Sequence, residues 1–414
     1  MCKVHLNHYY LFQDQNPPEI YNVTTPIDRT PLQALMDYSN PEYPRTYLTF
    51  PLPLTPSGRS TASLAVSSNR NPIIDGYFVP VLQENHKLCS IISIYEDRCG
   101  RLWILDSGLE TLDTFKCPPK IVIMDKNSEK ILEYYEFPSE YFKPASRMIQ
   151  MVVDENFKNC RDFKAIISDA VKEHLIVYEP ARERSWIVTS YRFRKQSIFE
   201  NIQYENITFS FPVGVYSIAL TPPSKKNGAR FLVFTVFSGN EIHSVQTTVL
   251  YDYRLWTEGF STRKLKYKDN DNLFTKIVKK FSHQEIEPEF VNVQKYFFSV
   301  GKTDVQIIGT CDIDENWIMY CGVMGGVTAI NVKRGSAGNI LIVKNDEMDY
   351  VSDVRIVKNP QGEEELFALK NSMLKILGKP FDATNMNYGY YGCKLNEIYD
   401  GDEVKCNPHI CAIR

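Results

Sequence analysis

Short apolar segments bounded by polar turns recur along the whole chain. They are four to seven residues long, too short for buried helices, and rich in the β-branched and aromatic residues that favour strands. Their mean spacing is about 64 residues, the length expected of one four-stranded propeller blade with its loops. The six segments are Tyr47–Phe50, Leu102–Asp106, Phe163–Asp169, Phe231–Thr235, Trp317–Tyr320 and Leu366–Leu369.

Three regions, 152–178, 311–330 and 354–377, show more of the repeating unit, which reads strand, polar turn, strand, short turn, strand. A helical period is limited to short stretches near Leu32–Met36 and Phe274–Phe281. The pattern therefore predicts an all-β protein, a six-bladed β-propeller with irregular N- and C-terminal extensions. Two separate β-sandwiches are the structural alternative.

The predicted division of the chain has three parts. An N-terminal extension covers residues 1–44, the propeller covers 45–378, and a cysteine-containing tail covers 379–414. With 414 residues and 43% apolar content, the chain has ample material for a buried core.

Charge and hydropathy exclude two classes of partner. The formal net charge is −3, which gives no basic field to hold a nucleic acid. The apolar runs are of strand length and fall far short of the roughly 20 residues that cross a bilayer. We expect neither a nucleic acid nor a membrane as partner.

Cysteine usage indicates an oxidising compartment, because an even number of cysteines is spread over the chain. The ten are Cys2, Cys89, Cys99, Cys117, Cys160, Cys311, Cys321, Cys393, Cys406 and Cys411. Glycosylation sequons at Asn22 and Asn206 point the same way. Since Met1–His8 lacks the apolar stretch of a signal peptide, we expect a secreted glycoprotein whose leader is missing from this sequence.

The last cysteines flank a histidine, in the order Cys406, His409, Cys411. Thiolate and imidazole are ligands that zinc prefers, but no second pair with matching spacing lies nearby. The prediction is therefore disulfides that hold a C-terminal tail, with no metal site.

The segment Cys99–Gly108 reads CGRLWILDSG and is similar to the insect yellow and major royal jelly protein family. Further segments match the family in the same order: Cys117–Lys120, Asn159–Asp162, Leu175–Tyr178, Ser185–Trp186 and Gly214–Pro222. The resemblance covers residues 45–378 and implies a six-bladed propeller in a secreted insect protein.

The resemblance also implies two disulfides, Cys99 with Cys160 and Cys89 with Cys117. Where the family usually has a Cys-Trp-Asn string, this chain reads Gly325–Asn331 without Cys or Trp, so it is a divergent member. Cys311 and Cys321 resemble a local replacement, paired with each other or with the tail cysteines. The pairing of the remaining cysteines stays open.

Some family members bind serotonin and related amines in the central cavity. The polar positions of that site carry over to Ser352 and Asn371, with Met373 in place of an aromatic residue. The hydroxyl and amide could bond an ammonium or hydroxyl group, and the thioether could cover one face of a ring. In the alternative interpretation, Ser352 and Asn371 satisfy backbone groups at strand ends.

An ammonium ligand needs a counter-charge or a ring face. Asp353, Asp106 and Asp169 are candidates for the counter-charge, because each lies at or beside the end of a recurring strand. The alternative, which we favour, is that these aspartates cap turns.

Other family members convert dopachrome during melanin formation. That reaction requires a base with a tuned pKa and a group that stabilises an enolate. The seven histidines form no motif, and His174 and His243 are expected at the surface on strand edges. Gly301–Thr303 resembles the end of a phosphate-binding loop, but Tyr296 occupies the position of its upstream glycine, so we expect no cofactor.

Three functions therefore stay open. The first is a secreted protein that binds a small aromatic amine or catechol in its central cavity. The second is a dopachrome-converting enzyme of the melanin pathway. The third is a structural protein of cuticle or eggshell, in which some of the 25 tyrosines are cross-linked and extracellular matrix proteins are the partners.

Overall fold

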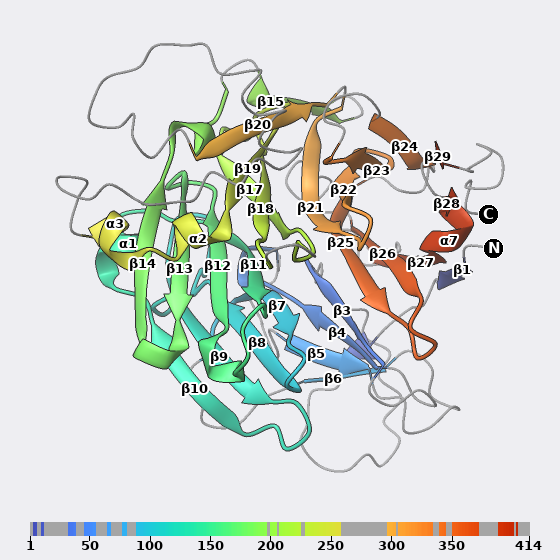
Figure 1. Ribbon diagram of the computed structural model, residues 1–414. Coiled ribbons are helices and arrows are strands. Elements are labelled where there is room, and N and C mark those ends of the chain that lie inside the picture. Colours follow the sequence, from blue (N-terminus) through green and yellow to red (C-terminus); the bar gives the residue numbers. More distant parts are fainter. Residues whose placement is uncertain are drawn as a thin grey trace.

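The described strands are arranged as a β-propeller around a central axis (Figure 1). The structure is a computed structural model. It describes residues 3–5, 10–11, 32–38, 45–54, 64–67, 77–80, 88–196, 199–204, 207–224, 228–257, 296–303, 305–333, 339–344, 350–371, 388–400 and 403–404. These residues form six sheets of four or five strands and two ribbons of two strands. The predicted all-β class and propeller arrangement are confirmed.

Four sheets are each built from four consecutive antiparallel strands. The first two contain β7 (Ile91–Glu96), β8 (Arg101–Asp106), β9 (Lys120–Asp125) and β10 (Ile131–Glu136), then β11 (Met148–Asp154), β12 (Lys164–Asp169), β13 (His174–Glu179) and β14 (Arg184–Thr189). The other two contain β17 (Val215–Leu220), β18 (Phe231–Val236), β19 (Glu241–Gln246) and β20 (Phe297–Lys302), then β21 (Ile307–Ile313), β22 (Ile318–Val323), β23 (Gly326–Asn331) and β24 (Asn339–Lys344).

The two remaining sheets each include a strand from near the N-terminus. One contains β3 (Ala34–Asp37), β4 (Arg45–Thr49), β5 (Leu64–Ser67) and β6 (Tyr77–Pro80), with β2 (Tyr10–Leu11) added in parallel to β6. The other contains β25 (Val351–Lys358), β26 (Glu364–Asn371), β27 (Tyr388–Lys394) and β1 (Lys3–His5). Strand pairing thus extends beyond residues 45–378 on both sides, because β3 and β27 supply ladder partners that the backbone groups of β4 and β26 require.

The first strands of the six sheets surround the axis. The inner strands β3, β7, β11, β17, β21 and β25 are neighbours in that order, and β25 lies against β3 again. Two separate sandwiches would not produce this closed order. Each predicted apolar segment falls in a different sheet and overlaps the strand that pairs with the inner one, namely β4, β8, β12, β18, β22 and β26.

Close packing of neighbouring sheets explains why the strands are apolar without alternation. β8 and β12 are buried at every position, because both faces of each sheet are covered. Trp103 and Trp186 are among the largest fully buried side chains. The stretch Leu32–Met36, whose spacing suggested a helical turn, instead enters strand β3, where pairing with β4 overrides the local pattern. Phe274–Phe281 lies outside the described residues.

Short α-helices, four 3₁₀ helices and two ribbons complete the described structure. The 3₁₀ helices are η1 (Leu52–Leu54), η2 (Cys160–Asp162), η3 (Pro180–Arg182) and η4 (Tyr191–Phe193). The α-helices are α1 (Ser139–Phe142), α2 (Thr247–Leu250), α3 (Tyr253–Thr257) and α7 (Leu395–Ile398), and the ribbons pair β15 (Asn201–Tyr204) with β16 (Ile207–Ser210) and β28 (Tyr399–Asp400) with β29 (Glu403–Val404). None of the helices in the described ranges has the length and apolar character needed to span a bilayer.

Both disulfides implied by the family resemblance are present in the structure. Cys89–Cys117 closes a stretch of the β7–β10 sheet, and Cys99–Cys160 links that sheet to the β11–β14 sheet. The third disulfide, Cys311–Cys321, joins paired positions of β21 and β22, which was one of the two arrangements expected. The tail cysteines Cys406 and Cys411 lie outside the described residues, as does Cys2, and the side chain of Cys393 is not described.

Candidate ligand site at the propeller axis

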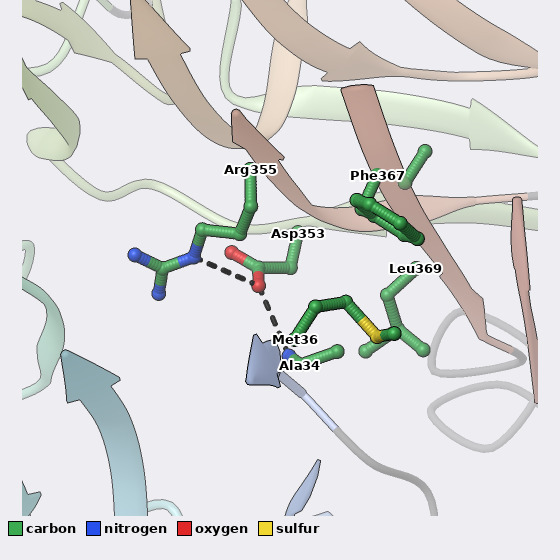
Figure 2. A pocket seen from close by; sticks show the side chains of 7 residues that line it. Ala34, Met36, Asp353, Arg355, Phe367 and Leu369 are labelled. Carbon is green, nitrogen blue, oxygen red and sulfur yellow. Dashed lines mark hydrogen bonds and ion pairs between the residues drawn. The ribbon is translucent and has the colours of Figure 1, made fainter. Parts of the chain in front are cut away.

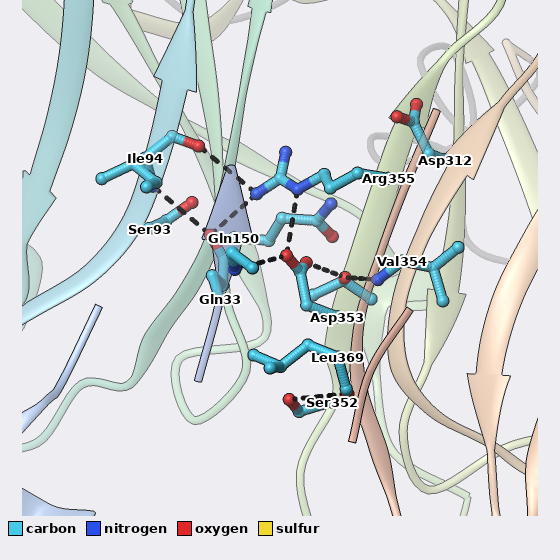
Figure 3. Close-up of polar contacts among 12 residues, drawn as sticks. Gln33, Ser93, Ile94, Gln150, Asp312, Ser352, Asp353, Val354, Arg355 and Leu369 are labelled. Atoms are coloured by element: carbon cyan, nitrogen blue, oxygen red, sulfur yellow. Dashed lines mark hydrogen bonds and ion pairs between the residues drawn. The ribbon is translucent and has the colours of Figure 1, made fainter. Parts of the chain in front are cut away.

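Polar side chains from the inner strands meet around the axis (Figure 3). Arg355 on β25 pairs with Asp353, with 3.2 Å between Nε and Oδ2. The second guanidinium nitrogen of Arg355 donates to the Gln33 side-chain oxygen at 2.8 Å and to the Ile94 carbonyl at 3.3 Å. One arginine therefore connects the last inner strand to the first two.

Gln150 connects three further inner strands. Its side-chain oxygen accepts from the Ile218 N–H at 2.9 Å, and its nitrogen donates to the Cys311 carbonyl at 3.3 Å. The Thr310 hydroxyl donates to Asp353, and the Ser93 hydroxyl accepts from β11. The axis is thus cross-linked by the chain's own polar groups.

Two buried polar atoms at the axis have no hydrogen-bond partner among the described residues. They are Nε2 of Gln33 and Oγ of Ser217. Both residues are fully buried. Since most buried polar groups in proteins are paired, these two atoms and Nε of Arg147 are the exceptions on or beside the inner strands.

A small recess opens beside Asp353 (Figure 2). It is about large enough for one water molecule and cannot take an aromatic amine as it stands. Its lining residues are Ala34, Met36, Asp353, Arg355, Phe367, Ala368 and Leu369.

The predicted ligand residues Ser352 and Asn371 lie close together and are buried. The Ser352 hydroxyl donates to the Leu32 carbonyl at 2.9 Å, the contact expected if it satisfies a backbone group. The Asn371 backbone N–H donates to the Tyr350 carbonyl at 2.9 Å. Met373 lies outside the described residues, so the ligand role of these three residues stays a prediction.

Asp353 is buried and already holds several donors. Its Oδ2 accepts from the Ala34 N–H at 3.0 Å and pairs with Arg355, and its Oδ1 accepts from Thr310. These contacts give the Asp353 carboxylate a structural role. An ammonium group would have to displace Arg355 to reach it.

Asp106 and Asp169 occupy equivalent positions at the ends of β8 and β12. Asp106 accepts backbone N–H groups from Cys89, Ser90 and Gly108. Asp169 accepts three backbone N–H groups, from Arg147, Val171 and Lys172. These contacts agree with the turn-capping interpretation.

The starts of the inner strands carry a cluster that the sequence did not reveal. We name Arg147, Phe211, Tyr216, Phe237 and Tyr350 the axial mouth. The Tyr216 and Tyr350 hydroxyl oxygens are 3.4 Å apart, and the Tyr350 hydroxyl donates to the Ile308 carbonyl at 2.9 Å. Burial raises the pKa of both phenols, which therefore stay protonated at neutral pH.

Aromatic rings line the axial mouth. The Phe237 ring lies 4.9 Å from that of Tyr216 and 5.1 Å from that of Phe211, measured between centroids. The Arg147 guanidinium carbon stands 5.1 Å from the Phe211 centroid. Tyr216 lies in the family-like string Gly214–Pro222, and Tyr350 stands two positions before Ser352, but nothing in the pattern showed that they meet.

The expectation of surface histidines is wrong. His174 and His243 are buried on β13 and β19 within their sheets. Burial, followed by the nearby Arg192, lowers the pKa of His243 to about 3, and burial lowers the pKa of His174. Neither residue belongs to the axial mouth, so neither is placed to act as a base there.

One group of potential metal ligands occurs among the described residues, formed by Cys89, Asp106 and Cys117. Its two sulfur atoms are bonded to each other, and the Lys120 ammonium lies 3.6 Å from Oδ2 of Asp106. A disulfide sulfur is a poor metal ligand compared with a thiolate, so this group is structural.

Together these features define a disulfide-linked β-propeller with a polar axis and a cluster of aromatic side chains beside it. A family profile described as "Major royal jelly protein" matches residues 89–285 and 292–404. The chain belongs to the major royal jelly protein family.

The chain is similar in sequence to several insect proteins. Dopaminechrome tautomerase of Drosophila melanogaster is 31% identical over 173 residues, 41% of this chain and 37% of that protein. Major royal jelly protein 3 of Apis mellifera is 21% identical over 329 residues, 75% of this chain and 53% of that protein. L-dopachrome tautomerase yellow-f of Drosophila melanogaster is 26% identical over 176 residues, 41% of each protein. The matched part of the chain thus spans 37% to 53% of the length of these relatives.

Among solved structures, a luciferin-regenerating enzyme aligns with a TM-score of 0.44 and 10% identity, covering 89% of this chain and 92% of that one.

Proposed function

We propose that this chain is a secreted, six-bladed propeller that binds a small aromatic amine or catechol at the axial mouth. The closed order of the six inner strands supports the blade number. Three disulfides and the family resemblance support an extracellular site of action, such as pigmentation, cuticle, eggshell or saliva.

The contact between Tyr216 and Tyr350 carries this proposal. The Tyr350 hydroxyl donates its one hydrogen to Ile308, so the hydrogen between the two phenols comes from Tyr216. Both donors are then used, and the pair offers a ligand only acceptor lone pairs. Acceptors among ring faces suit an ammonium group or a catechol hydroxyl.

Calorimetric titration with serotonin, dopamine and octopamine tests the proposal. We expect micromolar binding of at least one compound, weakened about tenfold in Tyr216→Phe because that variant loses a hydroxyl and keeps the ring. Tyr134→Phe is the matched control, because Tyr134 is exposed on the outer strand β10. Absence of binding by the wild-type protein to all three compounds and to the catechol L-DOPA would overturn the proposal.

A second candidate is tautomerisation of a dopachrome-like compound. Two of the matched relatives are named as tautomerases, of dopaminechrome and of L-dopachrome. To donate to the oxygen of a developing enolate, the Tyr216 hydroxyl would have to give up its hydrogen bond to Tyr350. A coupled assay for loss of dopachrome and dopaminechrome absorbance tests this activity. Silence in both the binding and the turnover assays would leave the structural role in cuticle or eggshell.

A further inference from the structure

Arg147 is a half-buried cation that lacks a carboxylate partner. Among the described residues, its side chain makes one hydrogen bond, to the Leu112 carbonyl at 3.2 Å, and its Nε is buried without a partner. Arg101, Arg230 and Arg355 each pair with an aspartate at 2.7 to 3.2 Å. A guanidinium drawn out of water without a counter-charge is costly, so its place at the axial mouth calls for an explanation.

The neighbouring carboxylates do not supply the counter-charge. Asp113 and Asp169 act on the Arg147 charge from a distance, yet burial still lowers the pKa of Arg147. Asp169 accepts the Arg147 backbone N–H, not its guanidinium, and its other oxygen accepts from Ser146. Apart from the bond to the Leu112 carbonyl, the guanidinium of Arg147 has no hydrogen-bond acceptor among the described residues.

We propose that Arg147 binds the carboxylate of the ligand, so that the axial mouth prefers amino-acid derivatives of catechols and indoles over the corresponding amines. A carboxylate supplies the missing counter-charge and accepts two parallel N–H bonds from a guanidinium. The ring of the same ligand lies against Phe211 and Tyr216, and its hydroxyl or ammonium donates to the phenol oxygens. This inference rests on the proposed function and narrows its ligand class.

The two named tautomerase substrates differ in this respect, because L-dopachrome carries a carboxylate and dopaminechrome does not. Because of Arg147, we expect this chain to prefer L-dopachrome over dopaminechrome. Repulsion between Arg147 and an ammonium group works in the same direction, since an amine without a carboxylate brings only like charge to the site.

Calorimetry with two matched pairs of compounds tests the preference. L-DOPA is compared with dopamine, and 5-hydroxytryptophan with serotonin, because the members of each pair differ only by the carboxylate. We expect the wild-type protein to bind the carboxylated member at least tenfold more tightly. Arg147→Gln should weaken L-DOPA binding at least tenfold and lower the ratio of L-DOPA to dopamine affinity about as much, while Arg147→Lys should retain part of the preference.

Arg98→Gln is the control variant, because its guanidinium also stands 5.1 Å from a phenylalanine centroid, that of Phe163, and lies outside the axial mouth. Equal binding of both members of each pair by the wild-type protein would overturn the inference and leave the proposed function standing. Equal weakening of both members in Arg147→Gln would also overturn it. Failure of the wild-type protein to bind any of the four compounds would overturn the proposed function and the inference together. If Arg147→Gln does not fold, the inference is still tested by the two compound pairs measured on the wild-type protein and on Arg147→Lys.

Discussion

The Asp353 carboxylate accepts a hydrogen bond from the backbone N–H of Ala34 at 3.0 Å, across 319 positions of sequence. The same carboxylate pairs with Arg355, which reaches Gln33 and Ile94. One buried ion pair therefore holds the first inner strand against the last, and the propeller ring closes through side chains as well as through strand packing.

Asp353→Asn should be strongly destabilising, by about 3–5 kcal/mol, because Arg355 would stay buried without its counter-charge. Urea denaturation followed by circular dichroism measures the loss. The exposed pair of Lys358 and Glu315 gives the control, since Glu315→Gln should change the free energy of unfolding by no more than about 1 kcal/mol. Equal effects of the two substitutions would contradict the closing role of Asp353.

Removal of a disulfide should lower the free energy of unfolding more when the disulfide closes a longer loop. Cys99 and Cys160 are 61 positions apart, whereas Cys311 and Cys321 are 10 apart. The chain-entropy model gives losses of about 4 kcal/mol for the long loop and about 3 kcal/mol for the short one. Guanidinium denaturation of the two double Cys→Ser variants measures the order, and the reverse order would show that packing, not chain entropy, dominates.

Glu364→Gln should stabilise the protein at alkaline pH. Burial and the neighbouring Asp314 raise the pKa of Glu364 from 4.5 to about 7. Because the folded-state pKa is raised, its favourable contribution is complete below pH 4.5 and is lost as the pH rises to 7. We expect Glu364→Gln to gain about 1 kcal/mol at pH 8, after allowance for solvent screening of a half-buried group, and nothing at pH 4.

Urea unfolding at both pH values measures the effect of Glu364→Gln. Glu140→Gln, at an exposed glutamate, is the control and should be neutral at both. A gain of the same size at pH 4 and pH 8 would refute an origin in ionisation.

The protein should lose stability in acid through His243. Its pKa is lowered from 6.5 to about 3, by burial first and by Arg192 second, so the folded state holds the neutral ring. A lowered histidine pKa gives stability that is complete above pH 6.5 and falls by about 1.4 kcal/mol for each pH unit below it, down to about pH 3. The ring lies between Glu241, whose carboxylate is 3.4 Å from Nε2, and Arg192, whose guanidinium nitrogen is 3.4 Å from Nδ1.

His243→Gln keeps a donor and an acceptor but does not titrate. Its unfolding free energy should therefore depend less steeply on pH between 6.5 and 4 than that of the wild-type protein, as followed by thermal denaturation at a series of pH values. Parallel pH profiles for the two proteins would rule out His243 as the source of acid sensitivity.

The fold could be predicted from the sequence because its strands are buried on both faces. Leu102–Leu105 and Ala165–Ile167 are continuous apolar runs, and each belongs to a separate sheet. The pairing of the two N-terminal strands, β1 and β2, was harder to predict. β1 and β2 are only three and two residues long, and their place depends on pairing with β27 and β6, which no local pattern encodes.

The candidate site was predictable only in part. Ser352 and Asn371 carry over by resemblance, and the structure places them beside Tyr350. Arg147 and Tyr216 come from other sheets, and their neighbourhood arises only when the ring closes. His174 and His243 were misjudged because a polar residue in an apolar strand reads as an edge position, whereas the packed sheets bury both.

The pairing of β1 with β27 has a consequence for biosynthesis. Among the described strands β1 is synthesised before all others and β27 after most of them, so β1 waits for its partner while the intervening strands are made. The four sheets of consecutive strands can form as they are synthesised. Until the ring closes, the partly folded chain exposes unpaired strand edges, which chaperones protect from aggregation. Substitutions that weaken the β1–β27 junction should therefore appear first as a low yield of folded protein, before any change in what the folded protein binds.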